Sequence, residues 1–314
     1  MNKTVGVIGL GNMGSGLALN LIKSGFDVVG HDLLQDKMDA LADMGGRPLQ
    51  DAAAVGREAS AVYVMVMNGD QVKAVLFGDG PQANGLLSTM GEGGVVLLTA
   101  TIHATEAEEI ARDMRGSRID LIDSPVSGGR PGAQGGTLTL MASAPAAVMS
   151  KWEPVMQAVS GTIHHVGEEP GVGQTVKGCL QSLIGSIFSA TFEASVLAAR
   201  AGVDADALLK VFSTSAAGCG ITNSALENVI ERKFQDTGSH ISTMYKDLTI
   251  SMDLARRHGV PLFTAATAMQ LFQAGITRYP DADNQTVAKV SEEIVGARLT
   301  RVGISSQSQS DSKQ

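Results

Sequence analysis

The sequence predicts an α/β domain with a parallel sheet, followed by an all-helical domain. Strand-like and helix-like segments alternate up to about residue 167, a glycine-rich turn joins the first strand to the first helix, and only helical patterns follow Gly171. The length of 314 residues suits about two domains. We expect domains at 1–167 and 168–300, and a disordered, serine-rich tail at 301–314.

The composition excludes several classes of protein. A formal charge of −8 and a pI near 5.2 leave no basic excess to neutralise the phosphates of a nucleic acid. No run reaches the about 20 apolar residues of a membrane span, because Gln181 and three serines interrupt the closest one, residues 178–192. Cys179 and Cys219 lack metal spacing and are typical of reduced thiols. We therefore expect a soluble, cytoplasmic protein.

A glycine-rich turn directly follows the first predicted strand, residues 4–10. Gly9, Gly11 and Gly14 have the spacing G-x-G-x-x-G, and residues 12–24 then have the apolar spacing of a helix. In such a unit the first glycine permits a tight turn, the second admits a pyrophosphate, and the third lets helix and strand pack closely. Because N–H groups at a helix N-terminus attract phosphates, the segment predicts a dinucleotide site.

A carboxylate ends the second predicted strand, residues 27–32. Asp32 lies about 20 residues beyond the turn, the usual position of the acid that binds the adenosine ribose. Its charge would repel a 2′-phosphate, and the next residues, Leu33 and Leu34, include no arginine to receive one. The sequence therefore predicts NAD rather than NADP. The alternative is a solvated acid at a turn.

Further α/β units continue the domain. Asn68 begins a helix with a cap-like residue, and Thr101 follows a strand, so both are expected at the carboxyl edge of the sheet, where ligands bind. His103 is a candidate acid–base residue, but the sequence supplies no partner for it, so we interpret it as a loop or helix-entry histidine. His164 and His165 lie on the last predicted strand of the domain, and we interpret both as structural. The expected helices are 33–44, 105–115 and 145–159, and the expected strands are 61–67, 94–100, 118–124, 135–142 and 162–166.

Residues 125–132 interrupt this alternation. Ser127 is followed by Gly128 and Gly129, and consecutive N–H groups in such a segment can turn inward as an anion nest. Glycine and proline equally form an ordinary loop. The residues alone leave both interpretations open.

A lysine lies near the start of a long, weakly charged helical run, residues 173–201. Burying an ammonium is costly unless it is paired or its pKa falls. The simplest interpretation is that the stem of Lys177 packs while its head reaches water. The alternative is a catalytic role. Further helices are expected at 204–214, 222–232, 241–258, 261–276 and 285–299.

Four segments, in this order, resemble the β-hydroxyacid dehydrogenase family, the relatives of 6-phosphogluconate dehydrogenase and 3-hydroxyisobutyrate dehydrogenase. They are residues 9–20 with Met13, residues 123–129, residues 171–177, and Lys246-Asp247-Leu248. The resemblance covers about residues 3–299. It implies a Rossmann-like domain, a long interdomain helix and a C-terminal helical domain, usually in a homodimer or homotetramer. It also implies a reversible, metal-free, NAD(P)-dependent oxidation of a small hydroxy acid.

The resemblance also implies roles for single residues. Lys177 is the expected general acid–base, and Ser127, Gly128 and Gly129 are expected to bind the substrate carboxylate. Asp247 is expected to support Lys246 beside the nicotinamide ribose. The residues expected to bind the cofactor are Gly9, Gly11, Asn12, Met13, Gly14, Asp32, Met67, Asn68, Thr101 and Lys246.

One residue departs from the family pattern. Many members have asparagine one helical turn beyond the lysine, where this chain has Gln181, whose extra methylene changes the pocket or moves the hydrogen-bonded substrate oxygen. With residues 30–33 and 213–218, Gln181 makes the chain look more like the branch that acts on four-carbon sugar acids such as L-threonate. 3-Hydroxyisobutyrate dehydrogenase and tartronate semialdehyde reductase are the alternatives.

Other classes fit less well. A dinucleotide sensor without catalysis would not need Lys177, and the related imine reductases typically replace that lysine by Asp or Tyr. A sugar-phosphate substrate would call for a dense group of basic residues that the sequence lacks.

Overall fold

The structure, a computed structural model, describes residues 3–80 and 84–301. The chain divides into two compact units, residues 1–177 and 178–314, and each is described by itself. Of the predicted tail at 301–314, all but Arg301 lies outside the described residues.

The first unit contains one sheet, with nine strands among the described residues in the order β3-β2-β1-β4-β5-β6-β8-β7, and β9 beside β8. Neighbours from β3 to β6 are parallel, and β8 is antiparallel to β6 and β7. The strand order reverses between β1 and β4, which is where ligands bind in such sheets. The strands are β1 (Thr4–Ile8), β2 (Asp27–His31), β3 (Arg47–Pro48), β4 (Ala61–Val64), β5 (Val95–Leu98), β6 (Asp120–Asp123), β7 (Val126–Ser127), β8 (Leu138–Ser143) and β9 (Ser160–Gly167).

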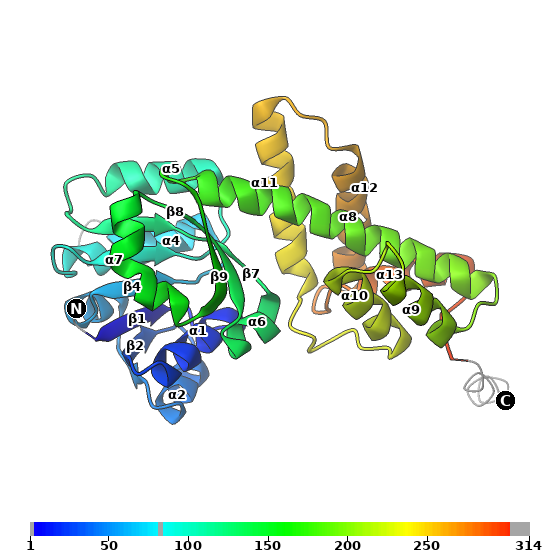
Figure 1. Cartoon of the computed structure of the whole chain (residues 1–314), viewed down its shortest axis with the longest axis horizontal. Helices are drawn as coiled ribbons and strands as arrows, with labels where there is room; N and C mark the ends of the chain where they lie inside the picture. Colours follow the sequence, from blue (N-terminus) through cyan, green and yellow to red (C-terminus); the bar gives the residue numbers. More distant parts are fainter. Residues whose placement is uncertain (1–2, 81–83, 302–314) are drawn as a thin grey trace. The chain divides into compact units, whose positions relative to one another are not determined.

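Helices cover both faces of this sheet (Figure 1). Alternate strand residues point to opposite faces, so Tyr63 and Leu97 join one core while Val64 and Leu98 join the other. The first core includes α1, α2, α6 and α7, and the second includes α3, α4 and α5. The helices are α1 (Asn12–Lys23), α2 (Gln35–Asp43), α3 (Ala52–Glu58), α4 (Gly69–Phe77), the 3₁₀ helix η1 (Leu86–Ser88), α5 (Ala104–Asp113), α6 (Gly129–Gly135) and α7 (Ala146–Gln157).

Helix α1 packs tightly on α6. A Cβ on Gly16 would lie 2.6 Å from the backbone carbonyl carbon of Ala133. The buried Asn20 side chain donates to the carbonyl oxygens of Ala133 at 2.7 Å and Gln134 at 3.2 Å, near the end of α6. Helix α6 is therefore fixed relative to the helix of the glycine-rich turn.

The predicted α/β alternation is confirmed, and five short elements were not predicted: β3, α3, η1, β7 and α6. The error at α6 has a clear cause. Residues 125–132 were interpreted as a loop or an anion nest because of their Gly and Pro content. Pro131 lies in the first turn of α6, where its missing N–H would have no partner within the helix, so it does not prevent the helix from forming.

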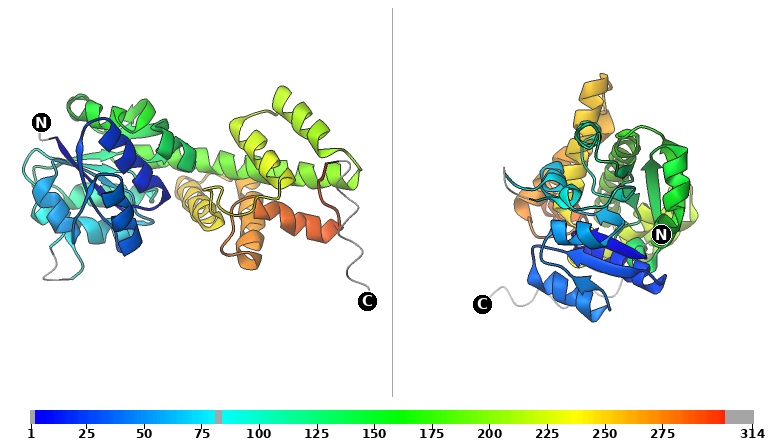
Figure 2. Two further views of the ribbon diagram at one scale, coloured as in Figure 1. Left: turned by 90° about the horizontal axis from the view of Figure 1, so that it is seen from below. Right: turned by 90° about the vertical axis from the view of Figure 1, so that its left-hand side faces the viewer.

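The second unit has a core made by helices, as predicted (Figure 2). Phe188 and Phe192 stack with ring centroids 5.7 Å apart, and Phe272 meets Phe188 edge-on at 6.3 Å. Its helices are the part of α8 (Val172–Arg200) from residue 178, α9 (Ala205–Thr214), α10 (Gly220–Ile230), α11 (Ile241–His258), α12 (Phe263–Arg278) and α13 (Thr286–Val295).

Helix α8 corrects one expectation. It has 29 residues and a mean hydropathy of 1.4 over an 18-residue window, so by length and composition it is able to cross a membrane. The serines that were expected to interrupt it bond within the helix: Ser186 donates to the Ser182 carbonyl at 2.7 Å, and Ser189 to that of Gly185 at 3.0 Å. Because Phe188 and Phe192 are buried in the core, we interpret α8 as a core helix.

Candidate active site

The glycine-rich turn has the geometry that a dinucleotide needs. Gly9 has φ +88°, and a Cβ there would lie 2.3 Å from the Met65 carbonyl oxygen. A Cβ on Gly14 would lie 1.8 Å from the Gly9 oxygen, so the helix and the turn touch. A Cβ on Gly11 would meet no atom within 4 Å. The first and third glycines are therefore required by packing, and the second leaves open space beside the turn.

Asp32 joins the end of β2 to this turn. One carboxylate oxygen accepts the Leu10 N–H at 2.6 Å, and the other accepts the Leu34 N–H at 3.0 Å. Leu33 beside it is 89% exposed. The carboxylate is thus held rigidly at the edge of the turn, with solvent next to it. The first two residues of α1 are Asn12, which is exposed, and Met13, which is half-buried.

The residues expected to flank the cofactor follow two neighbouring strands. Met67, 51% exposed, and Asn68 come after β4, and Thr101 comes after β5. The Asn68 side chain caps α4 by accepting the Gln71 N–H at 2.9 Å, as predicted. His103 is the N-cap residue of α5, which agrees with its structural interpretation. Because β4 and β5 are parallel neighbours, these residues share one edge of the sheet.

Ser127, Gly128 and Gly129 connect β7 to α6. Ser127 is half-buried, and both glycines are exposed. Gly128 has φ +128° and Gly129 has φ +59°, values that favour glycine. The segment therefore bends sharply into the first turn of a helix, and its N–H groups are those that a helix start leaves without helical partners.

Lys177 is buried, with 7% of its surface exposed. Its Nζ donates to the Val126 carbonyl oxygen at 2.8 Å. The ammonium therefore does not reach out to water, and the simplest interpretation of the sequence does not hold. Val126 directly precedes Ser127, so the structure brings the predicted proton-transfer group and the predicted carboxylate-binding segment together.

A buried polar cluster, which was not predicted, holds the start of α8. We call Asp123, Ser143, Gly171 and Gln174 the Asp123 cluster. One oxygen of the fully buried Asp123 carboxylate accepts the N–H groups of Gly171 at 2.8 Å and Gln174 at 3.3 Å and the Ser143 hydroxyl at 3.3 Å. The other accepts from the Gln174 side chain at 2.8 Å. Burial outweighs these bonds and raises the pKa of Asp123 to about 6.

The Gln174 amide links this cluster to the residues after β5. Its nitrogen also donates to the Ala100 carbonyl at 3.1 Å, and its oxygen accepts the Ile102 N–H at 3.0 Å. Both ends of the amide are therefore fixed. A polar residue at the end of an apolar strand and a glutamine in an apolar helix were the only signals in the sequence.

In the second unit, Gln181 and Lys246 share one carboxylate. The Gln181 amide nitrogen donates to Asp247 at 2.6 Å, and Lys246 lies 3.1 Å from the other Asp247 oxygen. Gln181 and Asp247 are buried. Helices α8 and α11 approach closely here, since a Cβ on Gly185 would lie 2.7 Å from Leu248. Asp247 therefore does support Lys246, and it also binds Gln181.

Comparisons with known proteins identify the family. Residues 4–167 match the family described as the NAD binding domain of 6-phosphogluconate dehydrogenase, and residues 171–291 match NAD-binding of NADP-dependent 3-hydroxyisobutyrate dehydrogenase. The chain belongs to the β-hydroxyacid dehydrogenase family.

Individual members of this family are similar over almost the whole chain. The L-threonate dehydrogenase of Cupriavidus necator is 35% identical over 92% of this chain and 96% of its own. The 3-hydroxyisobutyrate dehydrogenase structure from Salmonella typhimurium has a TM-score of 0.84 at 30% identity and covers 91% of this chain and 99% of its own. Psf3 in complex with NADP+ and 2-OPP has a TM-score of 0.83 at 25% identity, with the same two coverages.

These matches confirm the predicted fold of this β-hydroxyacid dehydrogenase, a Rossmann-like domain and a helical domain. They show an oxidoreductase that acts on a hydroxyl group and support a nicotinamide dinucleotide as its cofactor. The open space beside Gly11 and the fixed carboxylate of Asp32 fit such a cofactor.

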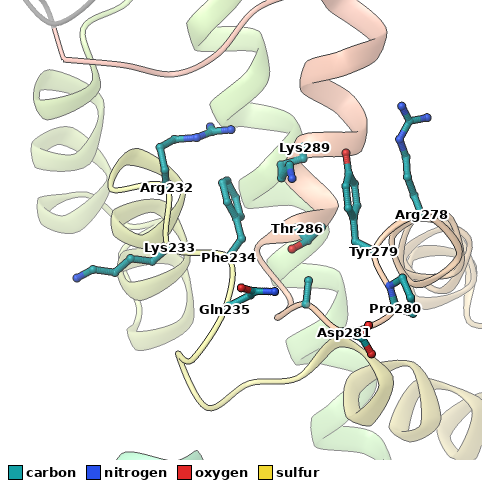
Figure 3. Close-up of a pocket in the computed structure, with 11 residues that line it drawn as sticks. Arg232, Lys233, Phe234, Gln235, Arg278, Tyr279, Pro280, Asp281, Thr286 and Lys289 are labelled. Atoms are coloured by element: carbon teal, nitrogen blue, oxygen red, sulfur yellow. The ribbon is translucent and has the colours of Figure 1, made fainter.

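A pocket of about 630 Å³ lies elsewhere in the dehydrogenase, within the second unit (Figure 3). Its basic residues have partners on the protein: Arg232 pairs with Glu292, Arg278 with Glu293 and Lys233 with Glu231, while Lys289 lies 4.1 Å from the Tyr279 ring centroid. The predicted site residues do not line it. Within residues 3–80 and 84–301, no group of three or more His, Cys, Asp or Glu is arranged to hold a metal ion.

Proposed function

We propose that this protein is an NAD-dependent dehydrogenase of a small hydroxy acid, with Lys177 as general acid–base and a four-carbon sugar acid such as L-threonate as substrate. The observation that carries the proposal is the buried Lys177 amine, held at the Val126 carbonyl next to Ser127. The similarity to L-threonate dehydrogenase supports the substrate.

The chemistry assigned to Lys177 is proton transfer. Bound NAD+ supplies the acceptor for the hydride that leaves the carbinol carbon. Lys177, as the neutral amine, takes the proton from the substrate hydroxyl onto Nζ, and the substrate carbon becomes a carbonyl. In the reverse direction the ammonium returns that proton and stabilises the negative charge that develops on the oxygen. Burial restricts the water that competes for the proton.

The segment of Ser127, Gly128 and Gly129 is assigned to the substrate carboxylate. Its donors are the serine hydroxyl and backbone N–H groups at the start of α6. These donors carry no formal charge. They therefore orient the carboxylate without adding a second cation close to Lys177.

NAD is proposed over NADP on the evidence of Asp32. Its carboxylate is fixed by Leu10 and Leu34, so it cannot easily turn away from a ribose phosphate. The family relative solved with NADP+ shows that NADP use occurs among similar proteins. The other residues proposed to bind the cofactor are Gly9, Gly11, Asn12, Met13, Gly14, Met67, Asn68, Thr101 and Lys246.

The substrate choice is proposed to depend on Gln181. Its amide nitrogen is bound to Asp247, which fixes the direction of the side chain. A fixed, longer amide favours a polyhydroxylated acid over the compact, methyl-bearing 3-hydroxyisobutyrate. Tartronate semialdehyde reductase remains the second alternative.

A substrate screen tests these assignments. Purified protein is mixed with NAD+ or NADP+ and with L-threonate, D-erythronate, D-glycerate or 3-hydroxyisobutyrate, and reduced cofactor is followed at 340 nm. We expect the highest kcat/KM with L-threonate and NAD+. A higher value with 3-hydroxyisobutyrate overturns the substrate, and absence of turnover with every acid favours a dinucleotide sensor.

We further propose a cytoplasmic homodimer or homotetramer with domains at 1–167 and 168–300. The bacterial origin of the similar dehydrogenase and the core position of α8 support the location.

A further inference from the structure

The first turn of α8 is attached to the end of β6. The Asp123 carboxylate accepts N–H groups of Gly171 and Gln174, which lie at the positive end of the helix. Gly173 allows the close approach, because a Cβ there would lie 2.6 Å from the backbone carbonyl oxygen of Met141 and 2.8 Å from that of Asp123. The position of the helix start along its axis is thereby fixed.

The Gln174 side chain fixes the rotation of the same helix. Its amide is bonded to Asp123, to the Ala100 carbonyl and to the Ile102 N–H, so a rotation of α8 would break several bonds at once. Gln174 and Lys177 are three residues apart and lie on the same face of the helix. Any displacement of Gln174 therefore also displaces the stem of Lys177.

The two attachments end on one segment of chain. Asp123 is the last residue of β6, and Val126, three residues later, accepts the Lys177 amine at 2.8 Å. The substrate segment begins with the next residue, Ser127. The Asp123 cluster thus fixes the distance between the amine and that segment.

We propose that Asp123 and Gln174 are positioning residues for Lys177, which hold the first turn of α8 so that the amine stays at the Val126 carbonyl beside Ser127. The proposal rests on the assigned role of Lys177 in proton transfer. Neither residue touches the reacting atoms; both act through the helix.

The first experiment compares steady-state kinetics of Gln174→Met and Asp123→Asn with the wild type, using L-threonate and NAD+. Misplacement of a catalytic group by about 1 Å can cost ~10²-fold, so we expect kcat to fall at least ~10-fold. The Kd for NADH, measured by fluorescence, should stay within about twofold. The matched control is Thr175→Val, because the Thr175 hydroxyl donates to Gly171 within the same helix at 2.8 Å. Its kcat should be unchanged.

A double-variant cycle separates positioning from general damage. If Asp123 acts through Lys177, adding Asp123→Asn to Lys177→Ala should reduce kcat no further than Lys177→Ala alone. A further loss equal to that of Asp123→Asn by itself overturns the proposal. Thermal unfolding of each variant shows the folded fraction, and Gln174→Met provides the test if Asp123→Asn does not fold.

The last measurement needs no substrate. Acetic anhydride labels amines, and mass spectrometry gives the rate at Lys177 relative to that at Lys233, whose side chain is 61% exposed. Loss of positioning should raise the Lys177 rate severalfold in Gln174→Met and leave it unchanged in Thr175→Val. An unchanged rate in both cluster variants overturns the inference. Normal turnover by Lys177→Ala overturns the proposed function instead, so the two failures are distinguishable.

Discussion

The chemical role of Lys177 depends on the surroundings of its amine. Its stem belongs to a weakly charged helix, and its amine is buried against the Val126 carbonyl. Taking an ammonium out of water costs free energy that polar contacts must offset, and the Val126 carbonyl supplies one such contact. The proton-transfer role proposed for Lys177 therefore concerns an amine that the fold holds away from bulk water.

Replacement of this lysine tests its role directly. We expect Lys177→Ala to lower kcat by at least ~10²-fold, because that is the usual contribution of a positioned acid–base group. The Kd for NADH should change little. Stopped-flow and steady-state rates with L-threonate check the first point, and fluorescence titration checks the second. Near-normal turnover would exclude Lys177 from the mechanism.

Asp32 is expected to decide the cofactor. Asp32→Ala combined with Leu33→Arg removes the charge that repels a 2′-phosphate and adds one that attracts it. The ratio of kcat/KM for NADP+ to that for NAD+ should rise by at least ~10-fold, from about 1.4 kcal/mol of differential binding. Both affinities should fall somewhat, since Asp32 also accepts the Leu10 N–H. A wild-type preference for NADP+ would contradict the assignment.

Gln181 is expected to affect selectivity more than rate. Gln181→Asn shortens the side chain and weakens its bond to the buried Asp247 carboxylate. The ranking of L-threonate, D-glycerate and 3-hydroxyisobutyrate by kcat/KM should change more than kcat on any one of them. The variant should also lose about 1–3 kcal/mol of unfolding free energy, the usual cost of a buried polar group that loses its partner. An unchanged ranking would count against a role in the pocket.

At the scale of elements, the glycines of the glycine-rich turn differ in role: Gly14 is required by packing, whereas Gly11 is proposed to make room for the cofactor. The space beside Gly14 is already occupied, since an added Cβ would lie 1.8 Å from the Gly9 carbonyl oxygen, whereas Gly11 faces open space. The two positions differ in the helix and turn contacts that they make, although they belong to one motif.

Matched alanine substitutions should reveal this difference. Gly14→Ala should lower the unfolding free energy by about 1–3 kcal/mol or more, because the helix must move away from the turn. Gly11→Ala should leave stability nearly unchanged and weaken NADH binding, because its methyl group enters the space proposed for the pyrophosphate. Urea unfolding and fluorescence titration measure the two effects. Equal losses of stability would show that this division is wrong.

Helix α6 and the Asp123 cluster show why other elements escaped prediction. The Gly and Pro content of residues 125–132 is typical of a loop, and only packing against Asn20 and β8 favours a helix there. Asp123 and Gln174 are distant in sequence and meet only because β6 ends where α8 begins. The glycine-rich turn and Asp32, by contrast, were predictable because their spacing is characteristic of one βαβ unit, and the Asp32 carboxylate finds both its partners, Leu10 and Leu34, close by in the sequence.

At the scale of the whole molecule, a buried carboxylate links folding to pH. Burial raises the pKa of Asp123 from 3.8 to about 6, so the folded chain binds this proton more tightly than the unfolded chain does. The stability contributed by the protonated form is full below about pH 4 and is lost as the pH rises through about 6.

The difference in unfolding free energy between wild type and Asp123→Asn isolates this contribution. As the pH rises from about 4 to 7, the wild type should lose about 3 kcal/mol of unfolding free energy relative to Asp123→Asn, since one pKa unit corresponds to about 1.4 kcal/mol. Urea unfolding at several pH values measures it. A difference independent of pH would mean that Asp123 keeps an ordinary pKa.

The sequence also predicted the division into an α/β part and a helical part, because the change from alternating to purely helical periodicity extends over many residues. It misjudged α8, whose serines were taken as polar interruptions. In α8 the hydroxyls of Ser186 and Ser189 bond to carbonyls one turn earlier, so these polar groups have partners within the helix and do not interrupt it.

The exposure of Leu33 next to Asp32 has a practical consequence for protein engineering. A side chain that is 89% exposed makes few contacts that a substitution can damage, whereas Gln181 is buried and bound to a buried carboxylate. Altering the redox cofactor is therefore a surface-design task that a small library can cover. Altering the substrate is a core-design task in which Gln181, Asp247 and their neighbours must be varied together.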